Sequence, residues 1–279
     1  MRLERVALDW FLGKVGRVAF WLIALVVAVS LAACSSAPTK KEEEMARAKA
    51  QEEAMRKEAQ MHYQVGLSYL GDAKCKEALI ELLKAEEMSA PSPEIYNAIG
   101  LAYFCLGEAQ KAKDAYSMAV ALRPDYSDAH TNLAALYLAQ GKWMKAIEES
   151  DAALRNRFYL NPERAYNNKA YALEMMGKDK EALENYNKAI RYNPRFIRAY
   201  ENLIAFFLRR DRIKDAREVL ANAESQGLTS AGLIYFKASL AMIYGDRQKG
   251  LKLFREVIKK YPNTPWARKA STYLTTLGK

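Results

Sequence analysis

The stretch PEIYNAIGLAYFCLGEAQKAKDAYSMAVALRPDY, residues 93–126, decides the fold of this chain. Apolar and small residues return in it at helical intervals, on both sides of a glycine and before a proline. They are Tyr96, Ile99, Gly100, Tyr103, Gly107, Ala112, Tyr116, Ala119 and Pro124. Side chains three and four residues apart share one helix face, and proline ends a helix. The stretch therefore predicts two packed helices, with the small residues Gly100 and Ala112 where they approach most closely.

These nine residues match positions 4, 7, 8, 11, 15, 20, 24, 27 and 32 of a 34-residue unit, and the pattern resembles the tetratricopeptide repeat (TPR). The same register recurs along the chain at intervals of 34 residues, with one interval of 36. Six repeats are expected in residues 59–263, starting near Ala59, Pro93, Ser127, Glu163, Ile197 and Ala231. The resemblance implies an all-α, right-handed superhelical solenoid, and residues 264–279 are expected to form a capping helix over its apolar end.

Residues 1–33 have the order of a secretory signal peptide: basic residues, an apolar run over residues 18–29, then small residues. Leu31-Ala32-Ala33-Cys34 resembles a bacterial lipobox, which implies acyl chains on Cys34 and a membrane anchor. Ser35 follows the cysteine, so similarity to Gram-negative lipoproteins implies the periplasmic face of the outer membrane. The alternative is a retained transmembrane anchor, although residues 18–33 are fewer than the roughly 20 apolar residues that a spanning helix needs.

Charge is unevenly distributed along the chain, whose formal net charge is +10. Residues 34–58 contain six basic and six acidic side chains and predict a solvated tether or an exposed helix. Residues 59–154 carry eight basic and thirteen acidic side chains, whereas residues 155–279 carry twenty-five and twelve. The basic half is suited to an acidic protein or anionic lipid headgroups, or is simply a solvated face; a nucleic-acid partner is not expected in the periplasm.

No catalytic residue, metal site or cofactor site is expected from the sequence. His62 and His130 fall at repeat position 4, which Tyr96, Tyr166 and Tyr200 occupy elsewhere, so both are interpreted as packing residues. The sequence contains no HExxH pair, no glycine-rich phosphate loop and no Cys-x-x-Cys spacing. The chain is therefore not expected to be an enzyme or to take a small-molecule substrate.

Two cysteines allow two readings. Cys75 and Cys105 fall at positions 17 and 13 of successive repeats, which places them at the same end of neighbouring antiparallel helices. They are either small buried hydrophobic residues, which is common for cysteine, or a periplasmic disulfide. A Cα separation beyond about 7 Å would exclude the bridge.

A protein-binding groove is expected from positions 2, 5, 9 and 12 of each first helix, which face the concave side in TPR arrays. In this chain the groove is predicted to be apolar in its first three repeats and polar afterwards; the alternative is a face that the chain partly covers itself. The predicted groove residues are Tyr63, Leu67, Leu70, Asn97, Leu101, Phe104, Thr131, Leu138, Asn167 and Tyr171.

One family shares both the lipobox and six TPR units: the chain resembles the type IV pilus biogenesis lipoproteins called PilF or PilW. The similarity is most specific at the 36-residue step, which runs through Tyr159 and Pro162 to Tyr166. It implies a pilotin, a lipid-anchored adaptor that helps the pilus secretin subunit to localise or oligomerise in the outer membrane. The alternative is a TPR scaffold lipoprotein for peptidoglycan enzymes or for outer-membrane protein assembly.

Overall fold

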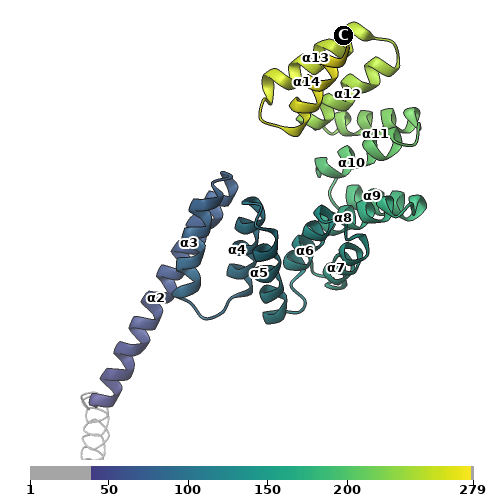
Figure 1. Ribbon diagram of the computed structural model, residues 1–279. Helices are drawn as coiled ribbons and strands as arrows, with labels where there is room; N and C mark the ends of the chain where they lie inside the picture. Colours follow the sequence, from purple (N-terminus) through teal and green to yellow (C-terminus); the bar gives the residue numbers. More distant parts are fainter. Residues whose placement is uncertain (1–38, 278–279) are drawn as a thin grey trace, which may run out of the picture. The chain divides into compact units, whose positions relative to one another are not determined.

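The structure is a computed structural model that describes residues 39–277 of the chain. These residues form thirteen α-helices and no strand, which confirms the predicted all-α fold class (Figure 1). The predicted signal peptide, the lipobox and Cys34 lie outside the described residues. No helix between residues 39 and 277 is both long and apolar enough to cross a bilayer.

The helices follow one another with short connections. Their bounds are α2 Lys40–Gly71, α3 Cys75–Glu87, α4 Pro93–Cys105, α5 Ala109–Leu122, α6 Ser127–Ala139, α7 Trp143–Arg155, α8 Pro162–Met175, α9 Asp179–Tyr192, α10 Ile197–Leu208, α11 Ile213–Ser225, α12 Ala231–Ile243, α13 Arg247–Lys260 and α14 Pro265–Leu277.

The described residues belong to two units, with the division between Lys57 and Glu58. In the first unit, residues 40–57 are the exposed, charged beginning of α2. The second unit contains the repeats, which start with the last part of α2 paired with α3. Four of the predicted repeat starts stand at the first residue of a helix, namely Pro93, Ser127, Ile197 and Ala231, while α8 starts at Pro162, one residue before the predicted Glu163.

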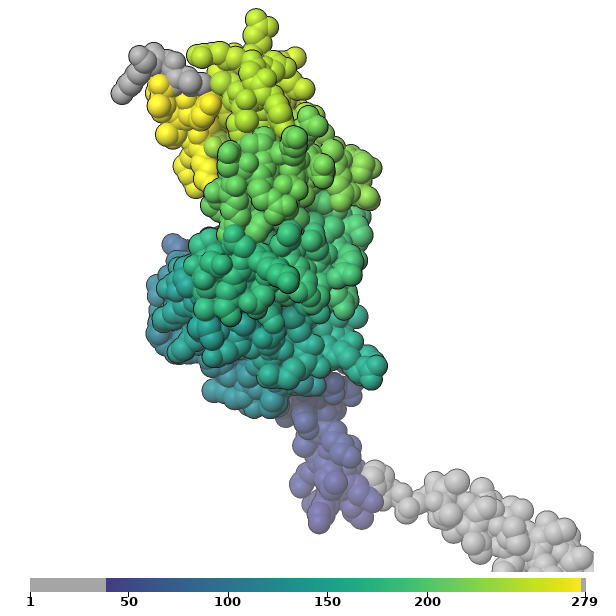
Figure 2. Space-filling model, turned by 90° about the vertical axis from the view of Figure 1, so that its right-hand side faces the viewer, coloured from purple at the N-terminus to yellow at the C-terminus, as the bar shows by residue number. Residues whose placement is uncertain are grey.

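Within the second unit, each odd-numbered helix from α5 to α13 packs against the helix before it. Figure 1 shows these helices as successive antiparallel pairs, and in Figure 2 the teal, green and yellow segments follow one another in sequence order. A solenoid has this organisation, because each repeat buries its apolar face against its neighbours in the chain.

Small residues allow the two helices of a repeat to approach each other closely. Ala112 and Ala119 on α5 are fully buried. A Cβ atom added to Gly100 would lie 2.5 Å from two ring carbons of Tyr116, which is itself 1% exposed. The repeat therefore needs glycine at this position for steric reasons.

Lys169 and Asp211 both depart from the repeat pattern, and each departure has a local explanation. Lys169 occupies position 7, which is usually apolar, and its Nζ lies 2.5 Å from Oδ1 of Asp151 on α7. Asp211 replaces the turn glycine of the fifth repeat and keeps the left-handed backbone conformation with φ of 56°. Aspartate tolerates this conformation better than most residues because its short polar side chain bonds locally.

The last helix covers the end of the array. Trp266 on α14 packs against Tyr235 and Phe236 of α12, with ring centroids 5.2 Å and 5.0 Å apart. Ala267 and Ala270 of α14 are buried in the same cluster as Phe254. The apolar surface of the sixth repeat is therefore buried, as a terminal repeat requires.

Candidate protein-binding surface

An apolar line runs along the first helices of repeats one to three. Tyr63, Leu67 and Leu70 of α2 are half-buried against a cluster that contains Leu82 and Ile99. Leu101 on α4 and Leu138 on α6 are also half-buried. Phe104 is 40% exposed at the end of α4. These side chains are anchored in the core on one side and remain accessible on the other.

Polar residues at position 5 differ from this line, because the structure buries them. Asn97, Thr131 and Asn167 are 8%, 1% and 3% exposed. Asn97 accepts a hydrogen bond of 2.8 Å from Asn132, and Asn167 accepts one of 2.9 Å from Asn202. These amides join neighbouring first helices. Three of the predicted groove residues are therefore buried within the array in this structure.

Tyr159, from the connection between α7 and α8, folds back onto the third repeat. Its hydroxyl lies 3.0 Å from Oγ1 of Thr131 and donates to Oδ1 of Asp128 at 3.3 Å. Burial, opposed by the hydrogen bond to Thr131, raises the pKa of Tyr159 to about 12. Tyr159 thus covers Thr131, one of the predicted groove residues, as expected if the chain covers part of this face itself.

A cluster of aromatic and charged side chains borders the apolar line. Burial, together with the nearby carboxylates of Glu94 and Asp128, raises the pKa of Tyr63. The pKa of Tyr126 is also raised, mainly by burial and to a smaller extent by the same two carboxylates. The ring of Tyr126 lies 5.0 Å from the Arg123 guanidinium. Arg123 also donates to Glu94. Both carboxylates are paired within the chain, because Glu94 accepts from Arg123 and Asp128 accepts from Tyr159.

In the second half of the array, Glu174 and Asp179 form ion pairs with two arginines of the next repeat. The Glu174 side chain is 1% exposed and accepts from Arg209 Nη2 at 2.6 Å, from Arg210 Nη1 at 3.0 Å and from the hydroxyl of Tyr186 at 2.9 Å. Arg210 also pairs with Asp179. Arg209 and Arg210 therefore join the fourth and fifth repeats.

Glu201 closes the N-terminus of α12. Its Oε1 accepts from the hydroxyl of Ser230 at 2.7 Å, and a Cβ on Gly232 would lie 2.5 Å from its Cδ. Burial is the largest influence on Glu201 and raises its pKa, although the bond from Ser230 and the charge of Arg198 oppose this. Glu201 thus belongs to the joint between the fifth and sixth repeats.

The two histidines are placed beside carboxylates of their own repeats. His62 Nδ1 lies 2.5 Å from Glu81, and His130 Nδ1 lies 2.7 Å from Glu149. His130 Nε2 also lies 3.0 Å from the carbonyl oxygen of Pro124. Burial lowers the pKa of His130, but the bonds to Glu149 and Pro124 outweigh it, so the pKa is raised. Between residues 39 and 277, no group of three or more His, Cys, Asp or Glu is arranged to hold a metal ion.

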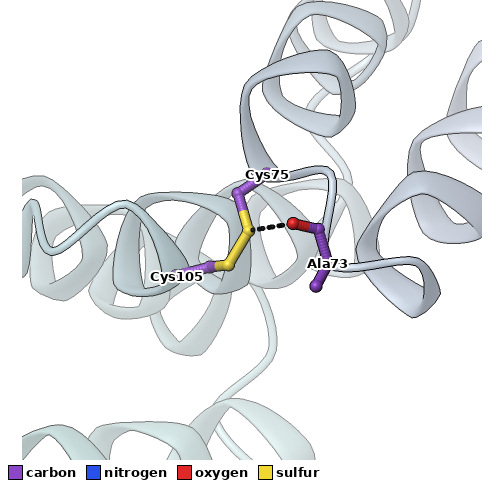
Figure 3. The surroundings of a disulfide bond; sticks show 3 residues. All are labelled: Ala73, Cys75 and Cys105. Atoms are coloured by element: carbon purple, nitrogen blue, oxygen red, sulfur yellow. Dashed lines mark hydrogen bonds between the residues drawn. A yellow bond between two sulfur atoms is a disulfide. The ribbon is translucent and has the colours of Figure 1, made fainter. Parts of the chain in front are cut away.

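Cys75 and Cys105 form a disulfide in the structure, with their Cα atoms 6.0 Å apart. This separation lies in the usual range for a bridge. Figure 3 shows the bond between the start of α3 and the end of α4, where Cys75 Sγ lies 3.3 Å from the carbonyl oxygen of Ala73. The bridge connects the first repeat to the second beside Phe104.

Sequence reasoning missed two prominent side chains of the connection between α7 and α8. Phe158 is 82% exposed and Leu160 is 90% exposed. A signal for Phe158 existed in the sequence. It occupies a turn position that holds the charged residues Asp125 and Arg195 in two equivalent turns.

Comparison with known proteins identifies the repeat. Residues 93–126, 125–194 and 231–264 match families described as tetratricopeptide repeat. A curated relative, photosystem I assembly protein Ycf3 of Rippkaea orientalis, is 36% identical over 96 residues, which are 33% of this chain. The match spans about half of the relative's own length, 54%.

Two solved structures, those of PilF and PilW, share the fold. PilF of Pseudomonas aeruginosa superposes with a TM-score of 0.62 and 19% identity, over 79% of this chain and 99% of that one. PilW, titled a widely conserved type IV pilus biogenesis factor, gives a TM-score of 0.64 and 16% identity, over 76% and 97%. TPR proteins mediate protein–protein interaction. The chain thus contains segments that match the tetratricopeptide repeat, and its helix pairs have the TPR fold that PilF and PilW share.

Proposed function

We propose that this chain is a lipid-anchored TPR adaptor for type IV pilus biogenesis, which assists the pilus secretin subunit in reaching the outer membrane or in oligomerising there. The likeness to PilF and PilW supports the proposal through the fold, since identities of 19% and 16% carry no more than that. The lipobox and the irregular third repeat add support from the sequence.

The observation that carries the proposal is the apolar line of the first three repeats. Leu101 and Phe104 remain accessible while the polar residue beside them, Asn97, is buried in the stacking of the repeats. An accessible apolar strip with a polar rim is typical of a groove that takes an amphipathic segment. A segment of the secretin is the proposed occupant.

The anchor is a separate part of the proposal. Acyl chains on Cys34 would hold the chain at the periplasmic face of the outer membrane, because two or more chains anchor far more firmly than one. Residues 40–57 are helical and exposed, which suits a spacer between an anchor and the repeats. As an adaptor, the chain would bind and deliver its partner without catalysing a reaction.

Gene deletion, followed by complementation, tests this function. We expect deletion to abolish heat-resistant secretin multimers and type IV pili, and the wild-type gene to restore both. Cys34→Ala should leave secretin as mislocalised monomers if delivery depends on the lipid. Normal multimers and pili in the deletion strain would contradict the proposal and would favour a scaffold for peptidoglycan enzymes or for outer-membrane protein assembly.

A further inference from the structure

The connection between α7 and α8 is a turn with internal hydrogen bonds, and it exposes two apolar side chains to solvent. Asn156 Oδ1 accepts from the backbone N–H of Phe158 at 3.0 Å, and its carbonyl oxygen accepts from that of Tyr159 at 3.1 Å. Tyr159 is tied down through its hydroxyl, as described above. Phe158 and Leu160, on either side of it, are 82% and 90% exposed.

The same turn recurs at another repeat junction with a different side chain at its tip. Asn193 Oδ1 accepts from the N–H of Arg195 at 3.0 Å, and its carbonyl accepts from that of Phe196 at 3.0 Å. Phe158 thus takes the place of Arg195, and Tyr159 that of Phe196. The fold therefore does not need an apolar residue at position 158, and burial of Phe158 by another molecule would explain its presence.

Neighbouring turns place arginines around these apolar side chains. Asn156 donates to the carbonyl oxygen of Asp125 at 3.3 Å, and Asn193 donates to Glu163, near the start of α8, at 3.2 Å. The three turns therefore lie along one edge of the repeats. On this edge Tyr192 is 60% exposed. The exposed arginines are Arg155, Arg157, Arg191 and Arg195, which form no ion pair within residues 39–277.

We infer that this edge, defined by Phe158, Leu160, Tyr192 and the four arginines, docks onto an anionic lipid surface. The side chains project from a turn whose backbone bonds are internal, so the edge offers little backbone for a peptide to pair with. Exposed apolar side chains that are flanked by an aromatic ring and by arginines suit the interface of a bilayer. There, arginines bind the anionic headgroups, and aromatic rings lie at the depth of these headgroups. The inference depends on the proposed function only in requiring a nearby membrane, and does not depend on the partner.

Tryptophan fluorescence of the full chain in vesicles tests the inference. Phe158→Trp is reconstituted into phosphatidylethanolamine and phosphatidylglycerol vesicles with brominated acyl chains, and the wild-type spectrum is subtracted. The matched control is Ile243→Trp, because Ile243 is 52% exposed at the end of α12, away from the edge. We expect emission from position 158 to shift to shorter wavelength and to be quenched, while position 243 stays unquenched.

A charge variant and a neutral membrane complete the test. The double substitution Arg157→Glu and Arg195→Glu, or vesicles of phosphatidylcholine alone, should reduce the quenching at position 158. Absence of quenching in anionic vesicles would overturn the inference, as would equal quenching at both positions. Concentration-dependent shielding of position 158 without vesicles would assign the edge to a protein interface instead. None of these outcomes depends on secretin, so the membrane inference and the proposed pilus function can each be contradicted without affecting the other.

Discussion

Asn132 donates a hydrogen bond of 2.8 Å to Asn97, and both side chains are buried between the first helices of the second and third repeats. Asn132 in turn accepts from Arg164 of the fourth repeat at 3.1 Å. A polar chain thus links three consecutive repeats beside the apolar line. It fixes the spacing of the helices that carry Leu101 and Leu138.

Replacement of Asn97 by alanine should destabilise the array. The substitution leaves the buried amide of Asn132 without its acceptor, which costs about 1–3 kcal/mol. We expect a lower midpoint in urea unfolding followed by circular dichroism. Asn187→Ala, at an exposed position of α9, is the control and should leave the midpoint unchanged or slightly raised. Equal midpoints for the wild type and Asn97→Ala would show that the amide pair contributes no stability.

Gly100→Ala tests the close approach of helices in the second repeat. The new methyl group would lie 2.5 Å from the ring of buried Tyr116, and overpacking of this kind costs about 1–3 kcal/mol. Gly71→Ala is a matched control, because its added Cβ would meet nothing within 4 Å beyond its chain neighbours and the nearby backbone of its own helix. Thermal unfolding should therefore separate the two variants, with a lower transition temperature only for Gly100→Ala. The same loss in both variants would argue against a steric cause.

The charge of His130 should make stability depend on pH. Because its folded-state pKa is raised above 6.5, the fold favours the protonated imidazole. Its contribution is complete below pH 6.5, the value for the unfolded chain, and is lost as pH rises through the folded-state pKa. NMR titration should show a lower pKa for His130 in Glu149→Gln, which removes the charge of the partner. An unchanged pKa of His130 in this variant would mean that Glu149 does not stabilise the protonated imidazole.

Reduction of the Cys75–Cys105 bridge should destabilise the first two repeats. The bridge closes a loop with a sequence separation of 30 residues, for which chain entropy gives about 3–4 kcal/mol. Thiol alkylation of protein isolated from cells, with and without prior reduction, should label both cysteines only after reduction. The oxidised chain should also melt at a higher temperature than Cys75→Ser/Cys105→Ser. Labelling of both thiols without reductant would show that the cysteines are free in the cell.

The repeat pattern predicted the fold because the spacing of its small and apolar residues determines how the two helices of a repeat pack. The close approach of the two helices is indicated by Gly100 and Ala112, and the end of the second helix by Pro124. These features depend only on residues within one repeat. The exposure of groove residues was less predictable. The period assigns Asn97 and Leu101 to the same face, but only the next repeat decides that Asn97 is covered by Asn132.

Irregular residues explain the remaining differences. Lys169 looks misplaced until the fold brings Asp151, from the preceding repeat, to its side chain. Leu160 lies in the 36-residue step, where the repeat register gives no equivalent position, whereas the exposure of Phe158 could have been predicted from its charged equivalents Asp125 and Arg195. Contacts between repeats, rather than within them, were the part that the sequence could not provide.

The most direct test of the central claim is a binding titration between the chain and the periplasmic part of the type IV pilus secretin of the same organism. Charges in the apolar line, as Leu101→Glu and Phe104→Glu, should weaken binding by at least about tenfold, which corresponds to about 1.4 kcal/mol. The matched control is Met118→Glu, at a 47% exposed position on α5, and it should bind like the wild type. Secretin binding that survives both groove substitutions would contradict the placement of the partner along this line.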